Sequence, residues 1–88
     1  ADKAAGKSVG EQTQEVLDII DATLAEAGTD KTKIISATIW LLNISTFGEM
    51  NAVWDKWVPA GNTPARATVE ARLASPQYHV EIAVIAAL

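Results

Sequence analysis

Two charged side chains in the last third of the sequence, Arg66 and Glu81, have the chemistry to bind and act on a small polar molecule. A guanidinium group is planar and always charged, so it can hold a carboxylate through two parallel hydrogen bonds. A carboxylate beside a water molecule can accept its proton and so assist hydrolysis. The structural alternatives stay open: Arg66 can pair with Glu70 or Glu81, and Glu81 can be an ion-pair partner or a water-bound surface carboxylate.

The segments that carry these residues alternate between apolar and polar side chains, which is typical of half-buried strands. Residues 65–73 and 78–87 are each predicted to form a strand, with a turn at residues 75–77. If the two strands pair as a hairpin with the apolar residues of both strands on one face of the sheet, their charged residues lie on the other face. The sequence therefore predicts that Arg66 and Glu81 share one face of the sheet.

Two amphipathic helices are predicted from apolar residues at helical spacing. The first runs from about Val9 to Ala27, and Ser8 with Glu11 forms a capping box at its start. The second runs from about Thr46 to Val58, with Thr46 and Glu49 as its own capping box. Its expected buried stripe consists of Phe47, Met50, Val53, Trp54 and Trp57.

Residues 34–43, between the helices, are rich in β-branched side chains and predict a strand that is apolar on both faces. The order α-β-α-β-β over residues 1–88 indicates one domain of the α/β (α+β) sandwich class, with two helices packed on one face of a mixed sheet. The opposite face of the sheet carries both charged side chains and the large apolar side chain of Ile85. We expect another subunit to cover it, which would place a site containing Arg66 and Glu81 at a subunit boundary.

Composition excludes several classes of protein. The 88 residues include no cysteine, so neither a disulfide framework nor a thiolate zinc site can supplement the small core. The formal charge of −4 and the scattered basic residues argue against a nucleic-acid partner. No apolar run reaches the ~18 residues of a membrane span and no signal peptide pattern is present, which predicts a cytoplasmic protein. His79 is interpreted as a surface residue, and no metal site is expected.

Several motifs together resemble the reactive-intermediate deaminase family (Rid, formerly YjgF, also called endoribonuclease L-PSP). The segments TPARATVEARL, residues 63–73, and VEIAVIA, residues 80–86, are similar to the family pattern P-A-R-x-x-V…L…(V/I)-E-I-x-x-x-A. Residues 11–17 resemble its Q-T-x-x-x-L helix, and residues 47–54 its F-x-x-(M/V)-N-x-x-(Y/W) helix. The likeness covers about residues 8–87. The family's N-terminal β-hairpin has no counterpart in this sequence.

The resemblance implies a chorismate-mutase-like fold and a homotrimer whose sheets line an inner barrel, with sites between neighbouring subunits. The implied activity is hydrolysis of reactive 2-imino or enamino acids to 2-keto acids and ammonia, without a cofactor or metal. By motif position, Arg66 would bind the substrate carboxylate, Glu81 would assist the attacking water, and Asn51 would lie near the cleft. Thr68 stands where cysteine is common in the family, and its hydroxyl can still form hydrogen bonds.

Two other functions stay open at this point. A non-catalytic trimer that binds small carboxylates is the alternative reading, because the N-terminal hairpin is missing. RNA cleavage, which has been attached to parts of the family, is disfavoured by the charge of −4 and the lack of a basic groove. For Asn51, capping a nearby loop is an alternative to ligand contact. Core packing is the interpretation of Trp40, Trp54 and Trp57.

Overall fold

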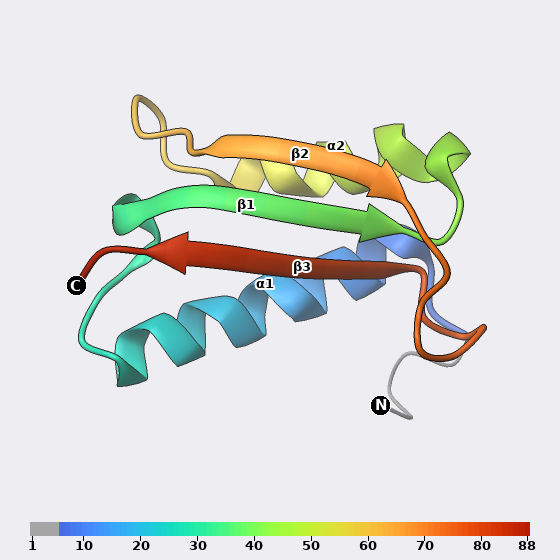
Figure 1. The fold of residues 1–88 in the computed structure, drawn as a ribbon, viewed down its shortest axis with the longest axis horizontal. Coiled ribbons are helices and arrows are strands. Elements are labelled where there is room, and N and C mark those ends of the chain that lie inside the picture. Colours follow the sequence, from blue (N-terminus) through green and yellow to red (C-terminus); the bar gives the residue numbers. More distant parts are fainter. Residues whose placement is uncertain (1–5) are drawn as a thin grey trace.

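A computed structural model describes residues 6–88 (Figure 1). Two short 3-10 turns, at Lys31–Lys33 and Ile44–Thr46, precede the first strand and the second helix. The helices and strands in chain order are α1 (Val9–Glu26), β1 (Ile34–Leu41), α2 (Phe47–Trp57), β2 (Ala65–Glu70) and β3 (Val80–Ala86). The predicted order α-β-α-β-β is therefore confirmed, and β2 ends three residues earlier than the alternating pattern suggests.

The three strands form one mixed sheet, and both helices lie against the same face of it (Figure 1). This arrangement confirms the predicted sandwich of two helices on one sheet. No helix within residues 6–88 is long and apolar enough to cross a membrane. We call the sheet surface that α1 and α2 cover the helix face, and the opposite surface the outer face.

The strand pairing differs from the predicted hairpin. β1 lies in the middle of the sheet, parallel to β2 and antiparallel to β3, so β2 and β3 are separated by a whole strand. The physical reason is the helix between β1 and β2: α2 returns the chain across the sheet, which makes the next strand parallel to its neighbour. Residues 71–79 then carry the chain past the end of β1 to its other edge (Figure 1).

This pairing places Arg66 and Glu81 on opposite faces of the sheet, so the predicted shared face is wrong within one chain. Arg66 is paired with Ala37, which is buried against the helices. Glu81 is paired with Trp40, three residues further along β1. Because side chains alternate along a strand, residues 37 and 40 point in opposite directions, and their paired neighbours follow them.

The core lies between the helix face and the two helices. Trp54 and Trp57 of α2 pack there as predicted, with ring centroids 5.4 Å apart. Two aromatic residues depart from the prediction: Phe47 is 38% exposed, and Trp40 lies half-buried on the outer face. The fully buried core side chains come from both helices and the central strand: Leu17, Ile39, Leu41, Met50 and Trp54.

The two predicted capping boxes have different outcomes. The box at α1 is confirmed, because the Ser8 hydroxyl accepts from the Glu11 N–H while the Glu11 carboxylate accepts from the Ser8 N–H. At α2 the Thr46 side chain makes no capping bond, because its hydroxyl donates to the Asn43 carbonyl within the preceding 3-10 turn. Glu49 instead accepts from the Gly10 N–H at 2.8 Å and so ties α2 to the first turn of α1.

The capping box predicts a pH-dependent stability. The hydrogen bond from the Ser8 backbone lowers the pKa of the Glu11 carboxyl, so the ionised form is favoured in the folded chain. A lowered folded-state pKa gives stability that is present above the unfolded pKa, about 4.3, and is lost as the pH falls through the folded value. We expect Glu11→Gln to be less stable than the wild type at pH 7, by a difference that shrinks as the pH is lowered below the unfolded pKa, as measured by urea unfolding. A pH-independent difference would contradict this role.

Candidate functional site

Arg66 reaches from the edge strand β2 over α2, where three side chains hold its guanidinium group. Its Nη1 donates to the Asn51 Oδ1 at 2.5 Å. Its Cζ lies 5.4 Å from the ring centroid of Phe47 and 5.6 Å from that of Trp54. Aromatic faces attract a cation within about 6 Å, so these rings fix the position of the charge without neutralising it. We call Arg66, Asn51, Phe47 and Trp54 the Arg66 cluster.

No carboxylate pairs with Arg66 in the described part of the chain, where the ion pair found joins Lys7 and Glu15. The two structural partners considered from the sequence are both placed elsewhere. Glu70 accepts a hydrogen bond from the Ile44 N–H at 2.9 Å, and Glu81 lies on the other face of the sheet. A half-buried guanidinium held by a neutral amide and aromatic rings keeps its charge and several N–H donors for an anion.

Asn51 is oriented by its neighbours on α2. Its Nδ2 donates to the Asp55 Oδ2 at 3.1 Å, one helical turn further on, so its Oδ1 is directed to Arg66. Phe47 lies one turn earlier, and side chains four residues apart share a helix face. The loop-capping alternative for Asn51 is therefore not what the structure shows.

Thr68 follows Arg66 by two residues on β2 and so points to the same side of the sheet. Its Oγ1 atom is buried and has no hydrogen-bond partner within residues 6–88. Buried hydroxyl groups are normally paired, so an unpaired hydroxyl at this position is unusual. The structure thus places Arg66, Asn51 and Thr68 on one side of the sheet.

Glu81 is exposed on the outer face, beside Trp40 of β1. The structure does not bring it to the Arg66 cluster, because the thickness of the sheet and three residues of strand separate them. The same outer face carries exposed apolar side chains: Ile85 is 65% exposed and Val69 is 44% exposed. Ile35, at the bulge of β1, is 60% exposed.

Phe47 is the residue of the cluster whose place the sequence did not indicate. Its apolar character assigned it to the buried stripe of its helix, yet its ring lies against Arg66 at the start of α2. The sequence did contain one indication of this contact. Phe47 precedes Asn51 by four residues, so the two side chains share a helix face, and a residue that contacts Asn51 is also near Phe47. The cation–π pairing itself depends on the parallel packing of β2 beside β1, which the predicted hairpin missed.

Two open hollows lie on the described surface, and one of them is beside Arg66. Their volumes are about 310 and 370 Å³. Among residues 6–88 no group of three or more histidine, aspartate or glutamate side chains is arranged to hold a metal ion. The smaller hollow lies over β1 and β2 and is lined by Ser36, Ala37, Thr38, Ala65, Arg66 and Ala67. The larger one borders the crossing loop and is lined by Leu42, Arg72, Leu73, Ala74, Ser75 and Pro76.

Comparison with known proteins shows the family. The family model described as Endoribonuclease L-PSP matches residues 1–88. A RutC family protein from Haemophilus ducreyi is 49% identical over 82 residues, which are 93% of this chain and 70% of that protein. A crystal structure of a YjgF family member from Neisseria meningitidis has 53% sequence identity and a TM-score of 0.90, covering 92% of this chain and 68% of that one. The chain therefore belongs to the Endoribonuclease L-PSP family, known also as RutC or YjgF, as its motifs indicated.

A more distant relative carries a name that describes an activity. The protein from Arabidopsis thaliana named Reactive Intermediate Deaminase A, chloroplastic, is 31% identical over 86 residues. The match covers 98% of this chain and 46% of the plant protein. This chain spans about two thirds of the length of its bacterial relatives and less than half of the plant protein.

Proposed function

We propose that this protein hydrolyses reactive 2-imino or enamino acids to 2-keto acids and ammonia. The observation that carries the proposal is the Arg66 guanidinium, half-buried and held by the Asn51 amide without a carboxylate counterion in the described chain. Such a group binds the carboxylate that every 2-imino acid carries. Membership of the family and the name of the Arabidopsis relative support the same reaction class.

In the proposed reaction Arg66 holds the carboxylate and so places the adjacent imine carbon. Water adds to this carbon and forms a C–O bond, while the nitrogen gains a proton. The C–N bond then breaks, ammonia leaves, and the remaining C–O group becomes the ketone. A carboxylate that takes the proton of the water and returns it to the departing nitrogen contributes about 10² to 10⁴ in rate. Imines hydrolyse readily, so orientation and this assistance are sufficient.

The proposed proton-transfer group is Glu81, and its position requires a second copy of the chain. Within one chain Glu81 lies on the outer face, whereas Arg66 lies on the helix face. We therefore propose a homotrimer in which Glu81 of a neighbouring copy completes each site. The exposed apolar residues Ile85, Val69 and Ile35 support burial of the outer face, because monomeric proteins seldom expose such a group of side chains.

One observation favours a second function, the binding of small carboxylates without turnover. The Arg66 cluster is complete within one chain, whereas the proton-transfer group is not. A chain that does not bring Glu81 to the cluster would keep the carboxylate site and lose the hydrolysis.

A coupled assay separates these functions. A pyridoxal-phosphate dehydratase acting on serine or threonine supplies the imine, and 2-keto acid release is followed with and without this protein. The proposal predicts faster release with the protein present. Binding of pyruvate in calorimetry without any acceleration would favour the carboxylate-binding function, and the absence of both would overturn the two together.

A further inference from the structure

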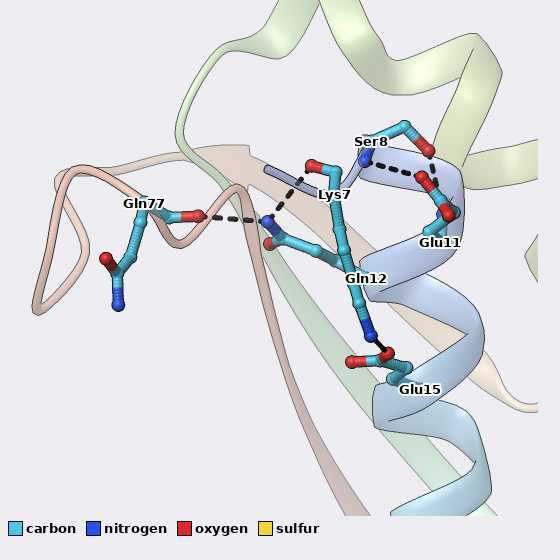
Figure 2. A network of polar contacts seen from close by, with 6 residues as sticks. All are labelled: Lys7, Ser8, Glu11, Gln12, Glu15 and Gln77. Atoms are coloured by element: carbon cyan, nitrogen blue, oxygen red, sulfur yellow. Dashed lines mark hydrogen bonds and ion pairs between the residues drawn. The ribbon is translucent and has the colours of Figure 1, made fainter. Parts of the chain in front are cut away.

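A buried glutamine joins the first turns of α1 to the segment that enters β3 (Figure 2). Gln12 is 4% exposed. Its Oε1 accepts from the His79 N–H at 2.8 Å, and its Nε2 donates to the Gln77 carbonyl at 2.9 Å and to the Lys7 carbonyl at 3.4 Å. One side-chain amide thus bonds to the main chain of two segments more than 60 residues apart in the sequence.

Two of the hydrogen bonds here are made by the main chain of His79, the residue before β3. The His79 N–H is held by Gln12, and the His79 carbonyl accepts from the Leu42 N–H at 3.0 Å. From that point Val80 is paired with Leu41 and Glu81 with Trp40. Because side chains alternate along a strand, a slip of one residue would turn Glu81 from the outer face into the core.

We propose that Gln12 is a positioning residue that holds Glu81 on the outer face at the register where it acts. The catalytic part of this inference rests on the proposed function, whereas the placement of Glu81 does not. A glutamine suits the task because its amide offers an acceptor to the His79 N–H and donors to the Gln77 carbonyl at once. A carboxylate has no hydrogen-bond donors, and an aliphatic side chain has neither donors nor an acceptor.

The test compares Gln12→Met and Gln12→Glu with the wild type by hydrogen exchange of the His79 and Glu81 amides, corrected for intrinsic rates. We expect Gln12→Met to lose about 10- to 100-fold of the protection at these amides at every pH, because the buried acceptor is gone. Circular dichroism establishes that each variant is folded. Unchanged protection in folded Gln12→Met would overturn the inference.

Gln12→Glu adds a readout that a general packing defect would not give. Burial among carbonyl groups raises the pKa of the introduced carboxyl, so its protonated form, which can still donate to Gln77, persists at acid pH. We expect protection near the wild-type level at low pH and its loss as the pH rises through that pKa. The ionisable neighbours of Gln12 are unchanged in Gln12→Met, so a pH effect found in both variants would contradict this explanation; they are Lys7, Glu11, Glu15 and His79.

Gln14→Glu is the matched control. Gln14 is exposed on the same helix, and its Nε2 donates to the Asp18 Oδ1 at 2.9 Å. The same chemical change there leaves the amides of β3 untouched, so we expect wild-type exchange at every pH. An equal loss of protection in this control would show that any carboxyl on α1 has the effect, and would overturn the specific role of Gln12.

Kinetics test the catalytic part. In the imine assay we expect Gln12→Met to lower kcat about tenfold and to leave KM within about twofold, because these hydrogen bonds of Gln12 go to main-chain atoms of Lys7, Gln77 and His79 and not to the group that binds the carboxylate. If Gln12→Met loses hydrogen-exchange protection but keeps the wild-type kcat, the proposed effect of Gln12 on catalysis through Glu81 is contradicted. A wild-type protein without imine hydrolysis would contradict the proposed function alone, because hydrogen exchange reports on Gln12 separately.

Discussion

Replacement of Arg66 with alanine is expected to lower kcat/KM for a 2-imino acid about 100-fold, with a fold that remains intact. A bidentate, charge-assisted contact to a carboxylate contributes about 2.7 kcal/mol when its partner is well oriented, which corresponds to that factor. In this chain the orientation comes from the Asn51 amide and the Phe47 ring, both in contact with the guanidinium. The measurement is the initial rate of keto acid release against substrate concentration in the dehydratase-coupled assay.

Two further arginine variants sharpen this result. Arg66→Lys keeps the charge and loses the planar fork, so we expect a smaller loss of about tenfold. Arg72→Ala removes an exposed arginine just beyond β2 and should leave kcat/KM within about twofold of the wild type. Equal activity of the wild type and Arg66→Ala would contradict the assignment of the carboxylate-binding role.

Replacement of Ile85 with glutamate is expected to dissociate the proposed trimer. Ile85 is 65% exposed on the outer face, where it is paired with Ser36 of β1, and this is the surface that a neighbouring copy would bury. A carboxylate placed in that contact would lose its hydration without gaining a partner, which opposes association of the subunits. Light scattering at micromolar concentration should change from about three times the 9.3 kDa of one chain to the mass of one.

Ile19→Glu is the control for this experiment. Ile19 is 64% exposed, almost the same as Ile85, but it lies on α1, away from the outer face. We expect this variant to keep the wild-type mass. A wild-type protein that is monomeric at micromolar concentration would contradict the assembly, and with it the completion of the site by a neighbouring Glu81.

The order of elements could be predicted because each depends on local patterns. The capping box of Ser8 with Glu11 and the apolar spacing of α1 and α2 act within a few residues, and the structure has them at nearly the predicted bounds. The pairing of the strands could not be obtained in the same way. The short turn at residues 75–77 suggested a hairpin, whereas the crossover through α2 makes β2 the parallel neighbour of β1 and leaves β3 for its other edge.

The candidate site, too, could be predicted where it depends on local sequence motifs and could not be predicted where it depends on strand pairing. The motif positions named Arg66, Asn51 and Thr68, and the structure places all three on one side of the sheet. The relation of Arg66 to Glu81 required the register of two strands on different edges of β1, so a face assignment based on alternation alone was wrong. Phe47 was missed because an aromatic residue on an apolar helix face is usually buried in the core, and here its ring lies against a cation instead.

The decay rate of the imine is the direct measure of whether this protein catalyses the proposed imine hydrolysis. The imine is generated by the dehydratase, and its absorbance is followed at increasing concentrations of the wild-type protein. If the protein is a catalyst, the decay rate rises in proportion to protein concentration. A rate that stays at the value of the uncatalysed reaction over the whole range would contradict it.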